Sequence, residues 1–121
     1  MPFGETTYGG ASVVAADGRV DMSNSDAFKD ALMAAVGSSK GAVIADLSKV
    51  DYISSAGLRS LMIALRSAKA GGKGFGVASL GPLVLEIFTI SRFNLVFSLF
   101  PSVREALAAL APDGLEPFDA S

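Results

Sequence analysis

The chain has 121 residues, half of them hydrophobic and 18% charged, which is typical of one folded domain and argues against a disordered chain. Its net charge of −2 provides no basic field for nucleic acid or an anionic membrane surface. The absence of Cys and His excludes disulfides, a thiol nucleophile, an imidazole base and an ordinary zinc site, and is consistent with a cytoplasmic protein.

Neither the first residues of the chain nor its most apolar stretch has the features of a signal peptide or a membrane span. The first ten residues lack the basic region and apolar core of a signal peptide. The most apolar run, from Leu83 to Ile90, is interrupted by Glu86 and is too short to span a membrane. We therefore expect no membrane insertion.

The first half of the chain predicts two strands and a helix between them. A strand is predicted over 11–16 and ends at an Asp-Gly turn, while an earlier strand near 5–8 is only weakly indicated because two glycines follow it. A polar cluster at 22–26 supplies N-caps for a helix that ends before Gly37. The apolar run 42–47 predicts a strand buried on both faces, with Asp46 as its odd member.

The strongest helical pattern follows, starting within 53–56 and ending at the glycines 71 and 72. Its apolar face includes Leu58, Leu61 and Leu65, and the residues assigned off that face are Arg59, Ser60, Arg66 and Lys69. Further along, the patterns predict a strand over 75–79, a helix from Pro82 to about 90, a strand over 95–100 and a helix capped by Ser102 and Glu105.

This alternation predicts an α/β domain over residues 1–111, with a mostly parallel four- to five-stranded sheet and about four helices. The remaining residues, 112–121, are rich in Pro, Gly and acids, and we expect a flexible acidic tail there. In such sheets, functional residues gather where strands end and helices begin.

The segment Ser54-Ser55 lies at one such junction. Two serines at a helix start are commonly N-caps and nothing more. The functional alternative is an exposed hydroxyl that accepts a phosphoryl group, since free backbone amides and the helix dipole stabilise an anion at this position. Gly57 is unfavourable in the first helical turn, so we expect a close approach of another group to its backbone.

Other polar groups leave two interpretations open. Asp21, Ser23 and Asn24 form either a plain turn or part of a functional rim shared with Ser55, if their strands are parallel. Asp46 and Asp51 are interpreted as solvated acids rather than an acid–base pair. The third helix, apolar nearly all round, is either well packed or partly exposed as a contact surface.

At these residues the chain resembles the STAS family, named for sulfate transporters and anti-sigma factor antagonists. The resemblance covers roughly residues 8–110 and is carried by the following segments: Gly18-Arg19-Val20-Asp21, Asp46-Leu47-Ser48-Lys49-Val50, Ser54-Ser55-Ala56-Gly57-Leu58 and Val103-Arg104-Glu105-Ala106-Leu107. Many members have D-S-S-G-L where this chain has Ser54-Ser55-Ala56-Gly57-Leu58, so the acid before the accepting serine is replaced by Ser54 and the serine after it by Ala56.

The resemblance implies an anti-sigma factor antagonist that is not an enzyme and needs no cofactor. Unphosphorylated, such a protein binds an anti-sigma factor serine kinase and frees the sigma factor; phosphorylation reverses this, and a metal-dependent serine/threonine phosphatase resets it. The accepting serine maps to Ser55, with Ser54 as the alternative acceptor, and the implied partner-binding residues are Asp21, Ser23, Asn24, Ser54, Ser55, Gly57 and Arg59.

Two other classes of function remain open at this point. The second is a STAS module without phosphorylation, acting as a subunit of a lipid-transport ABC system or as a stress-signalling scaffold. The third is an enzyme or small-ligand binder, for which a pocket with convergent polar groups would be needed. In all three cases we expect a monomer or weak dimer.

Overall fold

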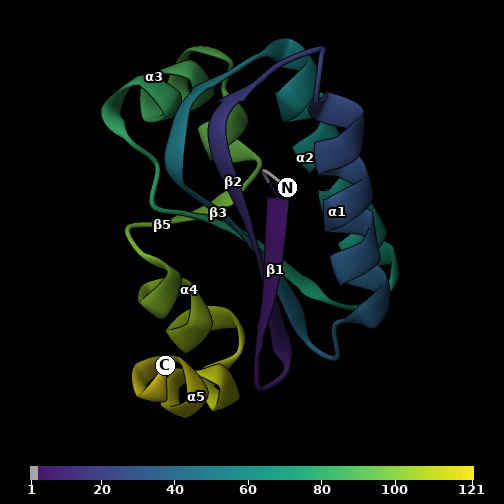
Figure 1. The fold of residues 1–121 in the computed structure, drawn as a ribbon, viewed down its shortest axis with the longest axis vertical. Helices are drawn as coiled ribbons and strands as arrows, with labels where there is room; N and C mark the ends of the chain where they lie inside the picture. Colours follow the sequence, from purple (N-terminus) through teal and green to yellow (C-terminus); the bar gives the residue numbers. More distant parts are fainter. Residues whose placement is uncertain (1–2) are drawn as a thin grey trace.

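A computed structural model describes residues 3–121 as one five-stranded sheet with helices on both faces (Figure 1). The strands lie in chain order across the sheet: β1 (Phe3–Tyr8), β2 (Ala11–Val20), β3 (Ala42–Ile53), β4 (Gly74–Ala78) and β5 (Ser98–Phe100). β1 pairs antiparallel with β2, and the other three pairs are parallel. The predicted α/β fold is confirmed, with a mixed sheet whose weakly indicated first strand is the antiparallel edge.

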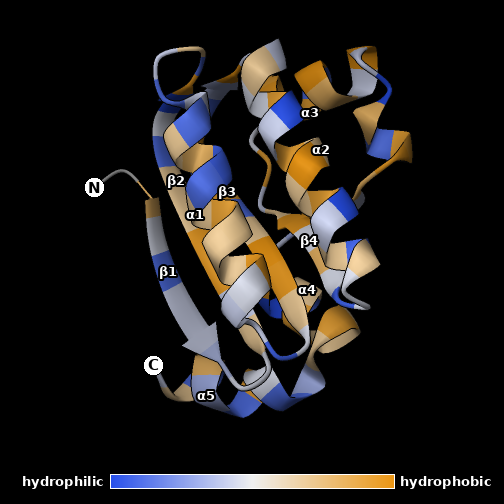
Figure 2. Ribbon diagram, turned by 90° about the vertical axis from the view of Figure 1, so that its right-hand side faces the viewer, coloured by the Kyte–Doolittle hydropathy of each residue, from blue (hydrophilic) through white to orange (hydrophobic). Residues whose placement is uncertain are grey.

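The helices form two layers around the sheet (Figures 1 and 2). One face is covered by α1 (Ser25–Ser38), α2 (Ser55–Ala70), α3 (Pro82–Ile90) and the 3-10 turn η1 (Phe93–Leu95). The other face carries α4 (Val103–Leu110), the 3-10 turn η2 (Pro112–Gly114) and α5 (Leu115–Ala120). The helix α4 begins as predicted, because the Ser102 hydroxyl accepts a hydrogen bond from the Glu105 amide at 3.1 Å.

The hydrophobic core is divided by the central strand β3. Val43 and Ala45 point into the cluster beneath α1 and α2, whereas Ala42 and Ile44 point into the cluster beneath α4. All four residues are completely buried, as expected for a strand covered on both faces. The predicted two-sided burial of this run is therefore confirmed.

Both central strands are longer than predicted. The Asp17-Gly18 pair does not end β2; Gly18 adopts a positive φ of 78°, and the register with β3 shifts around it while pairing continues to Val20. β3 likewise continues to Ile53, and after Leu47 its buried residues are Val50 and Ile53. Sequence reasoning missed the extension of β2 because an Asp-Gly pair occurs at bulges as well as at turns.

The last residues, for which the composition predicts a flexible acidic tail, have helical structure. Residues 112–120 fold as η2 and α5, and the ring of Phe118 packs edge-on against Tyr8 of β1 with centroids 5.2 Å apart. Arg104 of α4 makes a two-pronged ion pair with Asp119, both bonds being 3.0 Å. The described structure thus adds a fifth helix to the predicted four.

Three smaller predictions differ from the structure. The helix α1 continues through Gly37, and the strand predicted over 95–100 begins only at Ser98, because Leu95 belongs to η1. Ser60, assigned to the exposed side of its helix, is buried. Each difference concerns an element boundary or a small residue, for which local pattern carries little information.

Candidate functional site

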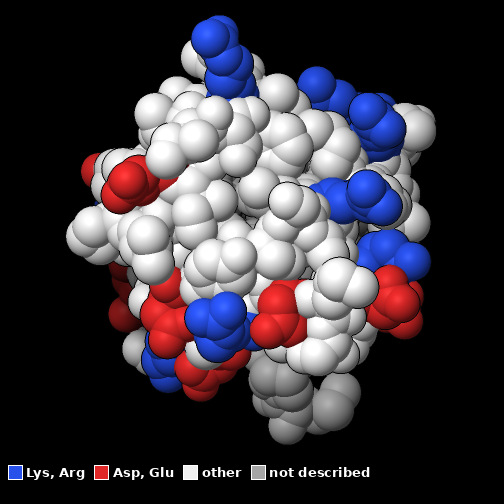
Figure 3. Space-filling view, turned by 90° about the horizontal axis from the view of Figure 1, so that it is seen from above, with Lys and Arg blue, Asp and Glu red and all other residues white. Residues whose placement is uncertain are grey.

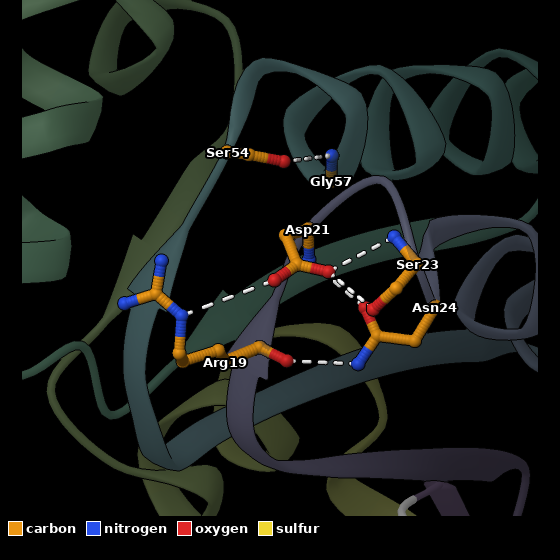
Figure 4. A network of polar contacts seen from close by, with 6 residues as sticks. All are labelled: Arg19, Asp21, Ser23, Asn24, Ser54 and Gly57. Atoms are coloured by element: carbon orange, nitrogen blue, oxygen red, sulfur yellow. Dashed lines mark hydrogen bonds and ion pairs between the residues drawn. The ribbon is translucent and has the colours of Figure 1, made fainter.

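The site lies on the rim where β2 and β3 end and the helices α1 and α2 begin. Val20 and Ile53 are partners in the parallel register, and the Ser54 amide donates a hydrogen bond to the Val20 carbonyl at 2.8 Å. This bond ties the start of α2 to the loop that follows β2. Asp21, Ser23 and Asn24 therefore share one rim with Ser54 (Figure 4), and with Ser55, which follows Ser54 in the chain, as parallel strands predict.

The two serines at the start of α2 have different environments. Ser54 is the N-cap; it is half-buried, and its hydroxyl accepts a hydrogen bond from the Gly57 amide at 3.3 Å. Ser55 is the first helical residue and is exposed, and its hydroxyl has no hydrogen-bond partner within residues 3–121. Of these two serines, Ser55 is therefore the one whose hydroxyl is exposed and uncommitted within the described residues.

Gly57 is explained by packing beneath the rim. A Cβ at this position would lie 2.6 Å from Cγ1 of Ile53 and 2.9 Å from Cγ1 of Val20. Gly57 is itself buried. Its role in the structure is to let α2 approach the ends of β2 and β3 closely, which differs from the surface contact that the resemblance implies.

The loop after β2 is held by a compact set of hydrogen bonds (Figure 4). Oδ1 of Asp21 accepts from the Ser23 amide at 2.9 Å and from the Ser23 hydroxyl at 2.6 Å. Asn24 spans the loop, its Oδ1 accepting from the Asp21 amide at 2.9 Å and its Nδ2 donating to the Arg19 carbonyl at 2.8 Å. These bonds fix the loop, so its polar groups present a defined surface rather than a mobile one.

Hydrogen bonds from Ser23 lower the pKa of Asp21, first through its hydroxyl and then through its amide. Arg19 adds a smaller electrostatic contribution from 3.9 Å away. The same guanidinium lies over the ring of Tyr52, 4.3 Å from its centroid, on the neighbouring strand. Asp21 is therefore an anion at neutral pH, close to the serine-bearing helix start.

The surface around Ser55 is hollowed on two sides. One hollow, of about 560 Å³, is lined by the following residues: Met22, Ser25, Asp26, Tyr52, Ser54, Ser55, Ala56 and Arg59. Seen from above, the middle of this end of the molecule is uncharged, and Lys, Arg, Asp and Glu lie around its border (Figure 3). Such a surface suits contact with another protein better than it suits a small ligand.

Three residues of the rim were missed by sequence reasoning. The hydroxyl of Ser60 donates to the Ser25 carbonyl at 2.8 Å and so joins α2 to the start of α1. Met22, 86% exposed, and Tyr52 line the hollow beside Ser55. The spacing of buried residues at the end of β3, Leu47, Val50 and Ile53, departs from strict alternation, so alternation would not have identified Tyr52. No sequence signal distinguishes Met22 from a core methionine.

The acidic residues of the described chain do not gather into a candidate metal site. Residues 3–121 contain no cluster of three His, Cys, Asp or Glu side chains that could hold a metal ion. The side chain of Asp46 accepts a hydrogen bond from the Ser48 amide at 3.0 Å, which is a local contact within β3. Among the helices of the described part of the chain, none combines the length and hydropathy needed to span a membrane.

Comparison with protein families gives one family profile, described as "Mlab, STAS domain", which matches residues 3–101. Among curated proteins, the chain is 34% identical over 100 residues to BtrV of Bordetella bronchiseptica, named as a candidate anti-sigma factor antagonist. That alignment covers 83% of this chain and 85% of BtrV.

Solved structures that superpose on the chain include anti-sigma factor antagonists. An anti-sigma factor antagonist from Mycobacterium paratuberculosis superposes with a TM-score of 0.82 at 30% identity, over 89% of this chain and 92% of that one. SpoIIAA, an anti-sigma factor antagonist solved in its unphosphorylated form, superposes with a TM-score of 0.74 at 15% identity, over 87% of this chain and 92% of that one. A structure of the phosphorylated form of SpoIIAA from Bacillus, at 14% identity and a TM-score of 0.67, covers 88% of this chain and 96% of that one. At this identity the likeness to SpoIIAA concerns the fold alone.

Proposed function

The chain belongs to the STAS domain family, and from this premise we propose that it is an anti-sigma factor antagonist that works by partner switching. Unphosphorylated, it binds a cytoplasmic anti-sigma factor that is also a serine kinase, and so releases the sigma factor. Phosphorylation of Ser55 by that kinase ends the complex, and a serine/threonine phosphatase restores it. The protein is a substrate in this cycle, so it needs neither a cofactor nor catalytic residues.

The observation that carries the proposal is the exposed, unpartnered hydroxyl of Ser55 beside a capped Ser54. In the reaction, Ser55 Oγ forms a bond to the γ-phosphorus of ATP, the bond to the β-phosphate oxygen breaks, ADP leaves and the hydroxyl proton passes to a base of the kinase. Ser54 is the poorer acceptor because its hydroxyl is half-buried and already accepts the Gly57 amide as the cap of α2.

A phosphate on Ser55 would change the surface without unfolding the domain. It adds about −1.5 to −2 charges at pH 7 in the first turn of α2, where the helix dipole favours a negative charge. The surface around Ser55 would then carry an anionic group next to Arg59, which lines the same hollow. A partner that buries this surface would have to desolvate the dianion, which weakens the complex strongly.

The test is to incubate the purified protein with ATP and each candidate anti-sigma kinase of the same genome, and to locate the phosphate by mass spectrometry. We expect phosphate on Ser55, none on a Ser55→Ala variant, and weakened kinase binding by Ser55→Asp. Phosphate on Ser54 would keep the mechanism and move the site. Unchanged kinase affinity of a verified phospho-Ser55 form would refute the switch.

A second candidate function is favoured by the exposed apolar side of α3. Leu83 and Ile90 are 51% and 74% exposed, although α3 carries a single charged residue, Glu86. Such a surface fits a constitutive interface, as in a STAS subunit of a lipid-transport ABC system or a stress-signalling scaffold. Co-purification with an ATPase subunit, without any phosphorylating kinase, would favour this alternative.

A further inference from the structure

A second hollow lies on the other side of Ser55, between α2 and the 3-10 turn η1. It has a volume of about 680 Å³, and its lining residues are Ser55, Arg59, Met62, Ile63, Arg66 and Phe93. The apolar part is formed by Met62, Ile63 and Phe93, and the described part of the chain leaves Ile63 36% exposed. We refer to this hollow as the α2–η1 groove.

The α2–η1 groove is bordered by positive charge alone. Arg59 and Arg66 are exposed, and neither forms an ion pair within residues 3–121. The helix α2 carries three basic residues and no acid, and the chain has no Asp or Glu between Asp51 and Glu86. This local charge is opposite in sign to the net charge of the whole chain, −2.

We propose that the α2–η1 groove docks an acidic amphipathic segment of the anti-sigma factor kinase, an inference that rests on the proposed function. Apolar side chains of the segment would contact Met62, Ile63 and Phe93. Its carboxylates would pair with Arg59 and Arg66, whose guanidinium groups have no competing partner in the described chain. Charge complementarity of this kind selects an acidic partner over a basic one.

The groove also connects docking to the switch, because Ser55 and Arg59 line both hollows of the rim. Ser55 and Arg59 are four residues apart on α2 and so lie on the same side of the helix. A phosphate on Ser55 therefore repels the carboxylates of the docked segment and competes with them for Arg59. The groove thus supplies a specific electrostatic reason for release of the partner on phosphorylation.

The experiment measures affinity of the unphosphorylated full-length chain for the kinase that phosphorylates it. Two groove variants are compared, Arg66→Gln for charge and Ile63→Ser for the apolar contact. Two controls match them: Lys69→Gln removes an exposed charge from the same helix outside the groove, and Met33→Ser removes an apolar side chain of α1 with a similar exposure, 37%. All four substitutions are at surface positions, and a thermal melt checks that each variant is folded.

We expect each groove variant to weaken binding about tenfold or more and each control to stay within about twofold, with the wild-type affinity falling as salt is added. Equal losses for Arg66→Gln and Lys69→Gln, or unchanged affinity in both groove variants while Ser55 is still phosphorylated, would overturn the docking site and leave the proposed function standing. Absence of binding by the wild-type chain to every kinase would overturn both.

Discussion

At the scale of single residues, the structure separates two serines that the sequence places side by side. Ser54 accepts the Gly57 amide and stabilises the start of α2, whereas Ser55 is exposed and its hydroxyl is unpartnered among residues 3–121. From the sequence alone, both were candidate caps and both were candidate acceptors. The difference depends on backbone geometry at one position, since only the extended conformation of Ser54, with ψ at 173°, turns its hydroxyl toward the helix amides.

Replacing Ser54 tests the assignment of the cap. We expect Ser54→Ala to lower the free energy of unfolding by about 1 kcal/mol, because the Gly57 amide loses its acceptor, and Ser54→Asp to restore most of that loss. Urea denaturation measures both. As a control, Ser55→Ala should change the unfolding free energy by less than about 0.5 kcal/mol, since its hydroxyl has no partner. Equal losses for the two alanine variants would show that Ser54 is not the cap.

Replacing Gly57 tests the close contact beneath the rim. The added methyl group of Gly57→Ala would lie within 3.0 Å of carbon atoms of both Ile53 and Val20. We expect it to destabilise the fold by about 1–3 kcal/mol, as overpacking of a core does. Gly37→Ala is the matched control, because nothing lies within 4 Å of a Cβ added there and alanine is the better helix former. Chemical denaturation measures the free energy of unfolding of both variants. A lower value for Gly37→Ala than for Gly57→Ala would contradict the role of Gly57 in close packing.

At the scale of elements, the helices were predicted better than the strands that carry the site. The helix α2 is defined by a periodic apolar face and α4 by its capping box, both of which are local patterns. The ends of β2 and β3 are defined by their mutual register. It pairs Val20 with Ile53, which lies 33 positions later in the sequence. A local pattern cannot show this pairing, so the sequence predicts the shared rim only on the assumption of parallel strands.

The helix α5 shows the same limitation at the end of the chain. The Pro, Gly and acidic residues of 112–121 suggested a flexible tail. In the structure, Phe118 packs on Tyr8 and Asp119 pairs with Arg104. We expect Phe118→Ala to lower the unfolding free energy by about 1–2 kcal/mol, through loss of the aromatic contact and of partial burial. Asp119→Ala should cost less than Phe118→Ala, because the ion pair is exposed. Proteolysis and denaturation of the two variants test this order, and a Phe118→Ala variant as stable as the wild type would contradict a packed α5.

The loop after β2 predicts a pH dependence. The pKa of Asp21 is lowered from its ordinary value of 3.8, mainly by the Ser23 hydroxyl. A carboxyl group with a lower pKa in the folded state stabilises the fold above 3.8 and loses this contribution as the pH falls through the folded-state pKa. Melting temperatures of the wild type and Asp21→Asn should therefore converge below that pH, and curves that stay parallel down to strong acid would contradict the hydrogen-bonded loop.

At the scale of the whole molecule, one end carries the features that the proposed function uses. The strands β2 and β3 end there, α1 and α2 begin there, and Ser55 lies between two hollows that share Arg59. Composition and element order were sufficient to predict the α/β class. The family resemblance indicated Ser55 as the candidate phosphorylation site. The hollows and the unpaired arginines beside Ser55 depend on how α2 packs next to η1, which only the three-dimensional structure shows.

The most direct measurement is the affinity of the kinase for the chain with phosphate verified on Ser55 alone, compared with the unphosphorylated chain. We expect a loss of affinity of about a hundredfold or more, which corresponds to about 2.7 kcal/mol or more, because a dianion is placed in the contact surface. Equal affinities of the two forms would contradict the proposed switch, because the rim around Ser55 would then not be the surface that the kinase binds.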